Sequence, residues 1–206
     1  MKKVFLAGLA TGVLILGVAG MASATNMIDN GSFESPALNN GTWQVFNNIT
    51  GWTKVAGTGI EVQNNVAGLS YDGFQHVELD SNTNSAMRQS VDTIVGTQYS
   101  LKFAYMDRPG TEAYTNGMDV LWDDILLTTI YGGVYTSWTL LDFLVDGGGN
   151  DTNLEFYATG RSDSYGGYID AVSMQPVPEP ATMLLLGTGL AGLVAARRRR
   201  KAAMQS

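Results

Sequence analysis

Tyr99-Ser100-Leu101-Lys102-Phe103-Ala104-Tyr105 is the stretch that decides the fold class of this chain. Its odd positions are apolar or aromatic, and its even positions are small or charged. Because successive side chains of a strand point to opposite faces, this alternation predicts a strand with one buried face and one solvated face. A helix is disfavoured, since its apolar residues recur roughly every three to four positions.

Short runs of the same kind recur through the middle of the chain. Alternation turns Val77 and Leu79 inward, so the intervening His76, Glu78 and Asp80 are expected on the solvated face. Other expected strands are 43–46, 60–63, 87–91, 118–127, 138–145, 153–158 and 168–174. Clusters of Gly, Asn, Asp and Ser between the runs mark turns. The pattern predicts an all-β fold, a two-sheet antiparallel sandwich.

Residues 1–24 are typical of a secretory signal peptide. Lys2 and Lys3 precede an apolar stretch at 4–21, and Ala22-Ser23-Ala24 supplies the small side chains that signal peptidase requires before its cut. A permanent N-terminal membrane anchor is the alternative, and the cleavage pattern argues against it. We therefore expect the mature chain to begin near Thr25.

A second targeting segment is predicted at residues 176–201. Three prolines at its start exclude a helix or a central strand there, because proline lacks a backbone donor and fixes φ. An uncharged apolar run follows at 181–196, and residues 197–201 are five consecutive cations. The run is shorter than the roughly 20 residues of a comfortable membrane span. Snorkelling arginines lengthen such a span and hold its end on the cytoplasmic side, so we expect a transmembrane helix at 181–196.

The segment Val177-Pro178-Glu179-Pro180, the apolar run and the basic end together resemble the PEP-CTERM sorting signal of Gram-negative bacteria. The resemblance implies cleavage near Pro178-Glu179-Pro180 by an exosortase, a membrane-embedded enzyme. It also implies delivery to the cell surface or the extracellular matrix of an organism that makes extracellular polysaccharide. The span is then a transient membrane tether, and the motif is the substrate of another enzyme.

The composition of residues 25–175 limits the function of the single domain expected there. The chain has no cysteine, which excludes disulfides, zinc-thiolate sites and thiol catalysis. Five Lys and Arg stand against 18 Asp and Glu in this range, a net charge of 5 − 18 = −13. Such a surface disfavours nucleic acid and favours calcium, neutral sugars or cationic surfaces. Acidity that only maintains solubility is the alternative.

A second resemblance extends over nearly all of residues 25–175. It rests on the order of short motifs, which opens with Asn30-Gly31-Ser32-Phe33-Glu34 and closes with Tyr168-Ile169-Asp170. This order resembles the galactose-binding-like jelly rolls, in particular certain plant cell-wall proteins of unknown function and their bacterial choice-anchor relatives. It is also similar to several carbohydrate-binding modules of glycoside hydrolases. The resemblance implies a jelly roll that binds polysaccharide without catalysis, often with a structural calcium.

The implied calcium site has two candidate ligands, Glu34 and Asp170. The resemblance implies that the first and last strands are neighbours, and it places both carboxylates where related modules hold an ion. Asp170 also interrupts the alternation between Ile169 and Val172, as a β-bulge does. The alternative is that both carboxylates accept backbone hydrogen bonds and hold no ion.

A glycan site needs an exposed aromatic face and a few fixed polar groups. The loop at 107–117 follows the clearest strand and carries Arg108, Tyr114 and Asn116, which we predict as ligand-binding residues. Arg108 offers a planar fork of donors for sugar hydroxyls or a carboxylate. Neutralisation of neighbouring acids in the loop is the alternative role for Arg108.

No catalytic site is predicted. His76 is the only histidine, and no serine lies in a Gly-x-Ser-x-Gly motif. The acids are so numerous that a carboxylate pair with glycosidase spacing arises by chance. We therefore predict a non-enzymatic, exported protein that binds extracellular polysaccharide. Two alternatives stay open: a structural or adhesion protein of the matrix without glycan binding, and a glycan-active hydrolase.

Overall fold

A computed structural model describes residues 25–177, 188–189, 192 and 197. The predicted signal peptide lies outside the described residues, as does nearly all of the predicted C-terminal span. No helix within the described part of the chain is long and apolar enough to cross a membrane.

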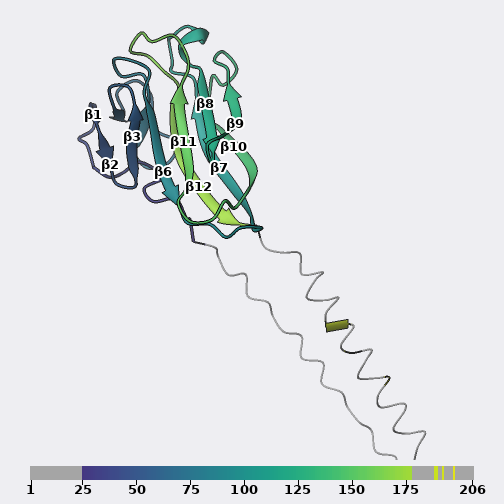
Figure 1. Ribbon diagram of the computed structural model, residues 1–206. Helices are drawn as coiled ribbons and strands as arrows, with labels where there is room; N and C mark the ends of the chain where they lie inside the picture. Colours follow the sequence, from purple (N-terminus) through teal and green to yellow (C-terminus); the bar gives the residue numbers. More distant parts are fainter. Residues whose placement is uncertain (1–24, 178–187, 190–191, 193–196, 198–206) are drawn as a thin grey trace, which may run out of the picture.

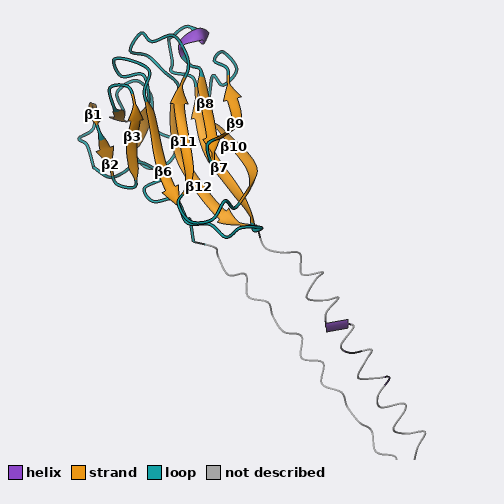
Figure 2. Cartoon of the chain, in the orientation of Figure 1, coloured by secondary structure: helices purple, strands orange, loops and turns teal. Residues whose placement is uncertain are grey.

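Two antiparallel six-stranded sheets pack face to face and make up the domain (Figures 1 and 2). The first sheet has the order β1-β4-β5-β12-β7-β10 and the second the order β2-β3-β6-β11-β8-β9. The strands are β1 (Thr42–Phe46), β2 (Asn48–Ile49), β3 (Trp52–Ala56), β4 (Ile60–Asn64), β5 (Gln75–Glu78), β6 (Ala86–Val91), β7 (Gln98–Met106), β8 (Met118–Trp122), β9 (Ile125–Ile130), β10 (Thr139–Asp146), β11 (Thr152–Ala158) and β12 (Tyr168–Pro176), with a 3₁₀ turn η1 (Ala113–Thr115) before β8. The predicted all-β, two-sheet jelly-roll sandwich is confirmed.

The core lies between the two sheets. Leu101, Phe103 and Tyr105 of β7 are fully buried, as the alternation in this strand predicts. The ring of Phe103 meets that of Phe156 on β11 in the other sheet, with centroids 5.1 Å apart. Burial of large rings is a main favourable term for such a domain, so this edge-to-face contact between Phe103 and Phe156 helps to join the sheets.

The sequence-based strand at 118–127 is wrong, because two strands occupy this region. β8 and β9 form a hairpin whose turn is Asp123-Asp124, and φ is positive at both residues, 53° and 61°. A type I′ two-residue hairpin turn requires positive φ at both central residues. Trp122 ends β8 and donates its indole N–H to the carbonyl of Asp146 at 2.8 Å, which ties the second sheet to the first.

The N-terminal segment runs beside β12, as expected for neighbouring first and last strands. The backbone N–H of Val172 donates to the carbonyl of Gly31 at 2.9 Å. A side chain at position 31 would lie 1.9 Å from the Val172 carbonyl oxygen, so only glycine fits here. The pairing register of β12 shifts between Asp170 and Ser173, which confirms the predicted bulge.

Candidate functional site

The loop that follows β7 is fixed in place by buried polar side chains. The Asp107 carboxylate accepts the backbone N–H groups of Gly133 (2.8 Å) and Tyr135 (3.2 Å) and so joins this loop to the 131–138 loop. Asn116 is 1% exposed, and its side-chain oxygen accepts the backbone N–H of Arg108 at 2.8 Å. Its amide nitrogen donates to Thr111 Oγ1 and to the carbonyl of Glu112. Asn116 therefore braces the loop from inside.

Arg108 is held at one end of the sandwich by a buried partner. Its guanidinium forms an ion pair with the carboxylate of Glu78 on β5, and only 16% of the Arg108 side chain is exposed. The same guanidinium lies 4.7 Å from the ring centroid of Tyr165. The acid that Arg108 neutralises therefore comes from another strand and not from its own loop.

The prediction that His76, Glu78 and Asp80 face solvent is wrong, because all three, on β5 and just after it, are fully buried. They do point away from the core between the sheets, but loops cover this outer face. Trp138 packs edge-on against His76 with ring centroids 5.9 Å apart, and Tyr71 packs against Trp138 at 6.0 Å. Alternation shows which residues share a face of a strand, whereas it does not show what covers that face.

Glu78 is the centre of a polar cluster beneath this cover. Its carboxylate accepts Gln63 Nε2 at 2.6 Å and the backbone N–H of Gly166 at 2.8 Å, in addition to Arg108. Gln63 also donates to Glu61 at 2.8 Å. Burial raises the pKa of Glu78 to about 8, although Arg108 acts in the opposite direction. The cluster therefore fixes the position of the Arg108 guanidinium from its buried side.

Two grooves lie on either side of residues 108–111. One, of about 440 Å³, is lined by Tyr165, Asp163 and Glu112 among others. The other, of about 390 Å³, includes Asn116, Gly133 and Thr136. Tyr165 is 47% exposed, so one part of its ring faces solvent while Arg108 lies against it. Asp163 Oδ1 is buried and has no hydrogen-bond partner among the described residues.

Tyr165 and Asp163 were not predicted from the sequence. Both belong to the loop before β12, which contains Ser, Asp and Gly residues and carries no motif. An aromatic residue in such a loop was the only available signal. Their proximity to Arg108 depends on the fold, because more than fifty positions separate Arg108 from each of them in the sequence.

The structure places Tyr114 apart from Arg108. Tyr114 is 56% exposed and lies 5.8 Å from the guanidinium of Arg161. It lines a third groove, of about 360 Å³, together with Tyr131 and a floor of glycines. The three predicted ligand-binding residues thus have different surroundings: Asn116 is internal, Arg108 faces one pair of grooves, and Tyr114 faces another groove.

The two predicted calcium ligands hold one loop. Glu34 Oε1 accepts the backbone N–H groups of Phe74 (2.7 Å) and Gln75 (2.8 Å). Asp170 Oδ2 accepts those of Tyr71 (2.7 Å) and Asp72 (2.9 Å). Burial raises the pKa of Asp170 to about 7, even with these donors.

These contacts fit an arrangement in which the two carboxylates hold the loop backbone better than one in which they bind a calcium ion. We call the first arrangement the backbone clamp. Asp170 Oδ1 accepts the N–H of Ala171, so three of the four carboxylate oxygens already have backbone donors. Calcium prefers six to eight oxygen ligands. In the described part of the chain, no group of three or more His, Cys, Asp or Glu residues is placed to hold a metal. Calcium binding by Glu34 and Asp170 stays a prediction.

Comparison with known proteins gives two results. Residues 176–200 match the model of the PEP-CTERM protein-sorting motif. Among solved structures, TmCBM61 in complex with β-1,4-galactotriose is similar, with a TM-score of 0.51 and 13% identity over 75% of this chain and 100% of that chain. Comparison with curated proteins gives no match.

Two further solved structures have lower scores. A "Family 16 Carbohydrate Binding Module-2" has a TM-score of 0.47 and 16% identity, covering 72% of this chain and 99% of its own. The CBM22-1 xylan-binding domain of Paenibacillus barcinonensis Xyn10C has a TM-score of 0.46 and 14% identity, covering 69% and 99%. The chain therefore carries a PEP-CTERM sorting motif, which marks an exported protein of a Gram-negative bacterium, behind a jelly-roll domain with the fold of a carbohydrate-binding module.

Proposed function

We propose that the domain binds polysaccharide without catalysis in the two grooves beside Arg108. The observation that carries this proposal is the pairing of Arg108 with Tyr165: a fixed cation lies against an aromatic ring that is 47% exposed at the edge of a groove. A sugar ring needs a flat apolar surface and a few fixed polar groups, and both occur here.

The polar groups of the grooves suit sugar hydroxyls. Arg108 supplies donors, and the exposed carboxylate of Glu112, which lines the same groove, supplies acceptors. The buried Glu78 beneath Arg108 leaves the guanidinium little freedom, so less side-chain entropy is lost on binding. The sorting motif indicates export, which would bring the domain into contact with extracellular polysaccharide.

Retention on a polysaccharide affinity gel tests this function. The gel is made from the exopolysaccharide of the producing organism, with β-1,4-galactan as a second probe because TmCBM61 is bound to a β-1,4-linked galactotriose. Tyr165→Ala is expected to weaken retention about tenfold, the equivalent of about 1.4 kcal/mol.

Tyr131→Ala is the matched control, because Tyr131 is 73% exposed and lines the groove of Tyr114 instead. Its retention is expected to equal that of the unchanged protein. A loss with Tyr131→Ala alone would move the site to the third groove. No retention on any polysaccharide would favour the alternative, a structural or adhesion protein of the matrix.

A further inference from the structure

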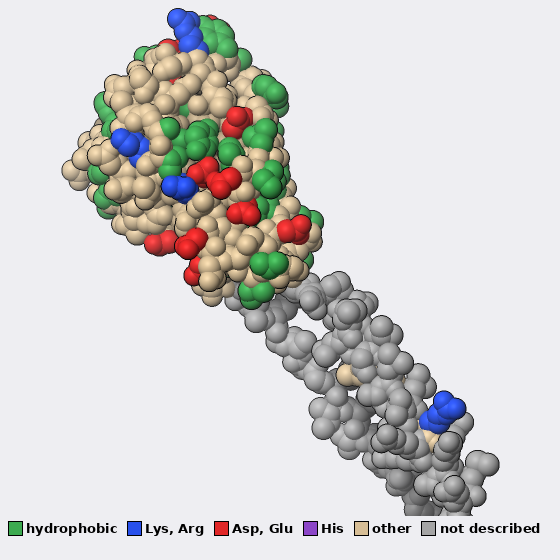
Figure 3. Space-filling view, in the orientation of Figure 1, with side chains coloured by type: hydrophobic (Ala, Val, Ile, Leu, Met, Phe, Trp, Pro, Cys, Tyr) green, Lys and Arg blue, Asp and Glu red, His purple; other side chains and the backbone are tan. Residues whose placement is uncertain are grey.

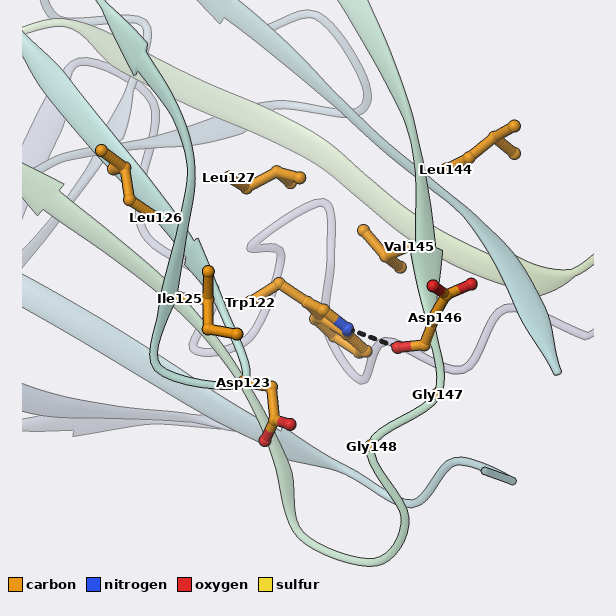
Figure 4. A pocket seen from close by; sticks show the side chains of 10 residues that line it. All are labelled: Trp122, Asp123, Ile125, Leu126, Leu127, Leu144, Val145, Asp146, Gly147 and Gly148. Carbon is orange, nitrogen blue, oxygen red and sulfur yellow. Dashed lines mark hydrogen bonds between the residues drawn. The ribbon is translucent and has the colours of Figure 1, made fainter. Parts of the chain in front are cut away.

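An apolar groove lies at the opposite end of the sandwich from Arg108. It runs between β9 and β10, the edge strands of the two sheets, and has a volume of about 330 Å³. Ile125, Leu126 and Leu127 line it from β9, and Val145 faces them from β10, while Leu144 lies at its rim and points outward (Figure 4). Trp122 forms its floor, held by the hydrogen bond to Asp146.

The apolar side chains around this groove are unusually exposed. Ile125 is 71% exposed, Leu144 61% and Leu126 55%. The adjacent 92–97 loop adds Ile94 at 69% and Val95 at 74%. This loop is fixed to the same end, because Gly147 donates its N–H to the carbonyl of Thr97 at 2.9 Å. We call these five residues the apolar end patch; clusters of this kind mark interaction surfaces.

The chain leaves the domain beside the apolar end patch. Val177 donates its N–H to the carbonyl of Gln98 at 2.8 Å, and Gln98 pairs with Asp146 at the rim of the groove. The predicted membrane span begins at Ala181, so the intervening backbone reaches at most about 14 Å. While the chain is tethered by this span, the patch must therefore lie close to the bilayer.

The length of the predicted span brings the patch closer still. Residues 181–196 are uncharged and apolar, and as a helix they would extend about 24 Å, against a hydrocarbon core of about 30 Å. A span shorter than the hydrocarbon core draws its flanking residues toward the interface. The domain is then held against the headgroups by its own tether.

The charges around the patch indicate which headgroups fit. Asp123 and Asp146 line the groove, and Asp124 lies in the adjacent turn. Figure 3 shows acidic and apolar side chains interspersed over the lower part of the domain. Carboxylates repel an anionic lipid surface and attract the outward-facing ammonium groups of zwitterionic headgroups. Exposed apolar side chains beside them can enter the headgroup region.

We propose that the apolar end patch docks on a zwitterionic phospholipid surface while the chain is tethered, and thereby holds Pro178-Glu179-Pro180 at a fixed depth for cleavage. The proposal rests on the sorting motif and the predicted span, and it does not depend on glycan binding. The glycan grooves at the other end stay free to face outward.

The absence of cysteine permits a direct test with the full chain. Val95→Cys, labelled with a fluorescent dye, is reconstituted into phosphatidylcholine vesicles that carry a quencher at headgroup depth. Val134→Cys is the matched control, because Val134 is 67% exposed at the opposite end. Quenching at position 95 is expected to exceed quenching at position 134 several-fold, and equal quenching would overturn the proposal.

Two further variants separate docking from mere proximity to the tether. Insertion of a long Gly-Ser segment between Val177 and Pro178 is expected to leave the quenching at position 95 in place, because the patch itself binds. Quenching that falls to the level of position 134 would overturn docking. Ile125→Asp in the lengthened chain is expected to abolish the quenching, with an unchanged melting temperature.

The type of lipid is tested with the unchanged patch. Vesicles of phosphatidylglycerol are expected to reduce the quenching at position 95, and stronger quenching there would overturn the assignment to zwitterionic lipid.

Discussion

At the scale of single residues, the burial of His76 makes its protonation unfavourable in the folded state. Its ring is fully buried, 4.3 Å from the ring of Tyr168, and both ring nitrogens are without partners in the described structure. Burial, with a smaller effect of Arg108, lowers the pKa of His76 from 6.5 to about 4. Between these values the unfolded chain binds a proton that the folded chain does not, so stability falls as the pH falls.

His76→Phe is therefore expected to reduce the acid sensitivity of folding. Phenylalanine fills the same space and cannot be protonated. The free energy of unfolding, measured with urea, should decrease from pH 7 to pH 4.5 by about 2–3 kcal/mol more in the unchanged protein than in the variant. Burial raises the pKa values of Glu78 and Asp170, which acts in the opposite direction, but this contribution is common to both proteins. Equal pH dependence in both would contradict the prediction.

Arg108 is expected to matter for folding as well as for binding. Arg108→Ala leaves the Glu78 carboxylate, which is 0% exposed, without its cation. Loss of one partner of a buried ion pair costs about 3–5 kcal/mol. The cost is reduced here because Arg108 is partly exposed and because Glu78, whose pKa burial raises to about 8, takes up a proton when its cation is lost. Thermal unfolding should show the loss, and Arg108→Ala combined with Glu78→Gln should recover part of it.

Arg161→Ala provides the control for this measurement. Arg161 is exposed and contacts the ring of Tyr114, so its removal should cost less than about 1 kcal/mol. Similar losses in both variants would show that Glu78 does not depend on Arg108. The expected instability also means that glycan retention by Arg108→Ala alone cannot define the site, which is why Tyr165→Ala is the better probe.

The sequence reveals local features of the site but not its long-range contacts. The position of Arg108 in a loop after a strong strand follows from periodicity and from the turn at Pro109-Gly110. Its partner Glu78 lies thirty positions earlier, and Tyr165 lies in a loop without a motif. Both contacts depend on how the strands are ordered in the first sheet, and hydrophobic alternation carries no information about this order.

At the scale of elements, alternation in the sequence predicts most of the strands, whereas the connections between strands are predicted only in part. β7 and β11 alternate strongly, and their predicted bounds differ from the observed ones by at most one residue at each end. The β8–β9 turn was missed because Asp123-Asp124 lacks the glycine that normally signals a two-residue turn. The cover over β5 was missed because it comes from loops around Tyr71 and Trp138, which have no periodicity.

Calcium binding can be tested through the 71–75 loop, whose backbone Glu34 and Asp170 hold. If Glu34 and Asp170 bind calcium as predicted, EDTA should lower the melting temperature of protein prepared with the ion. Calcium at 100 times its dissociation constant contributes about 2.7 kcal/mol, which is roughly 5–10 °C for a domain of this size. An unchanged melting temperature, together with a clear loss in Asp170→Ala, would assign both carboxylates to the backbone clamp alone.

At the scale of the whole molecule, the two ends of the sandwich present different surfaces. The end with Arg108 and Tyr165 presents polar grooves, and the end where Val177 leaves β12 presents the apolar end patch. If residues 181–196 tether the chain as predicted, the domain is expected to be oriented with its grooves away from the membrane. Cleavage at the sorting motif would release an intact sandwich, because the described strands end at Pro176.

Processing is the prediction that belongs to this scale. The secreted protein is expected to lack residues 1–24 and most residues after Pro178-Glu179-Pro180, so its intact mass should correspond to a chain that starts near Thr25 and ends near the motif. Glu179→Ala alters the matched motif while leaving every described strand unchanged, and it should accumulate as a membrane-bound form that keeps residues 197–201. The sandwich should be equally stable in both forms, since all described strands precede the motif and Val177, just before it, still bonds to β7. A cell-surface species of the unchanged protein that retains Arg197 to Arg200 would show that cleavage does not occur, and the tether would then be permanent.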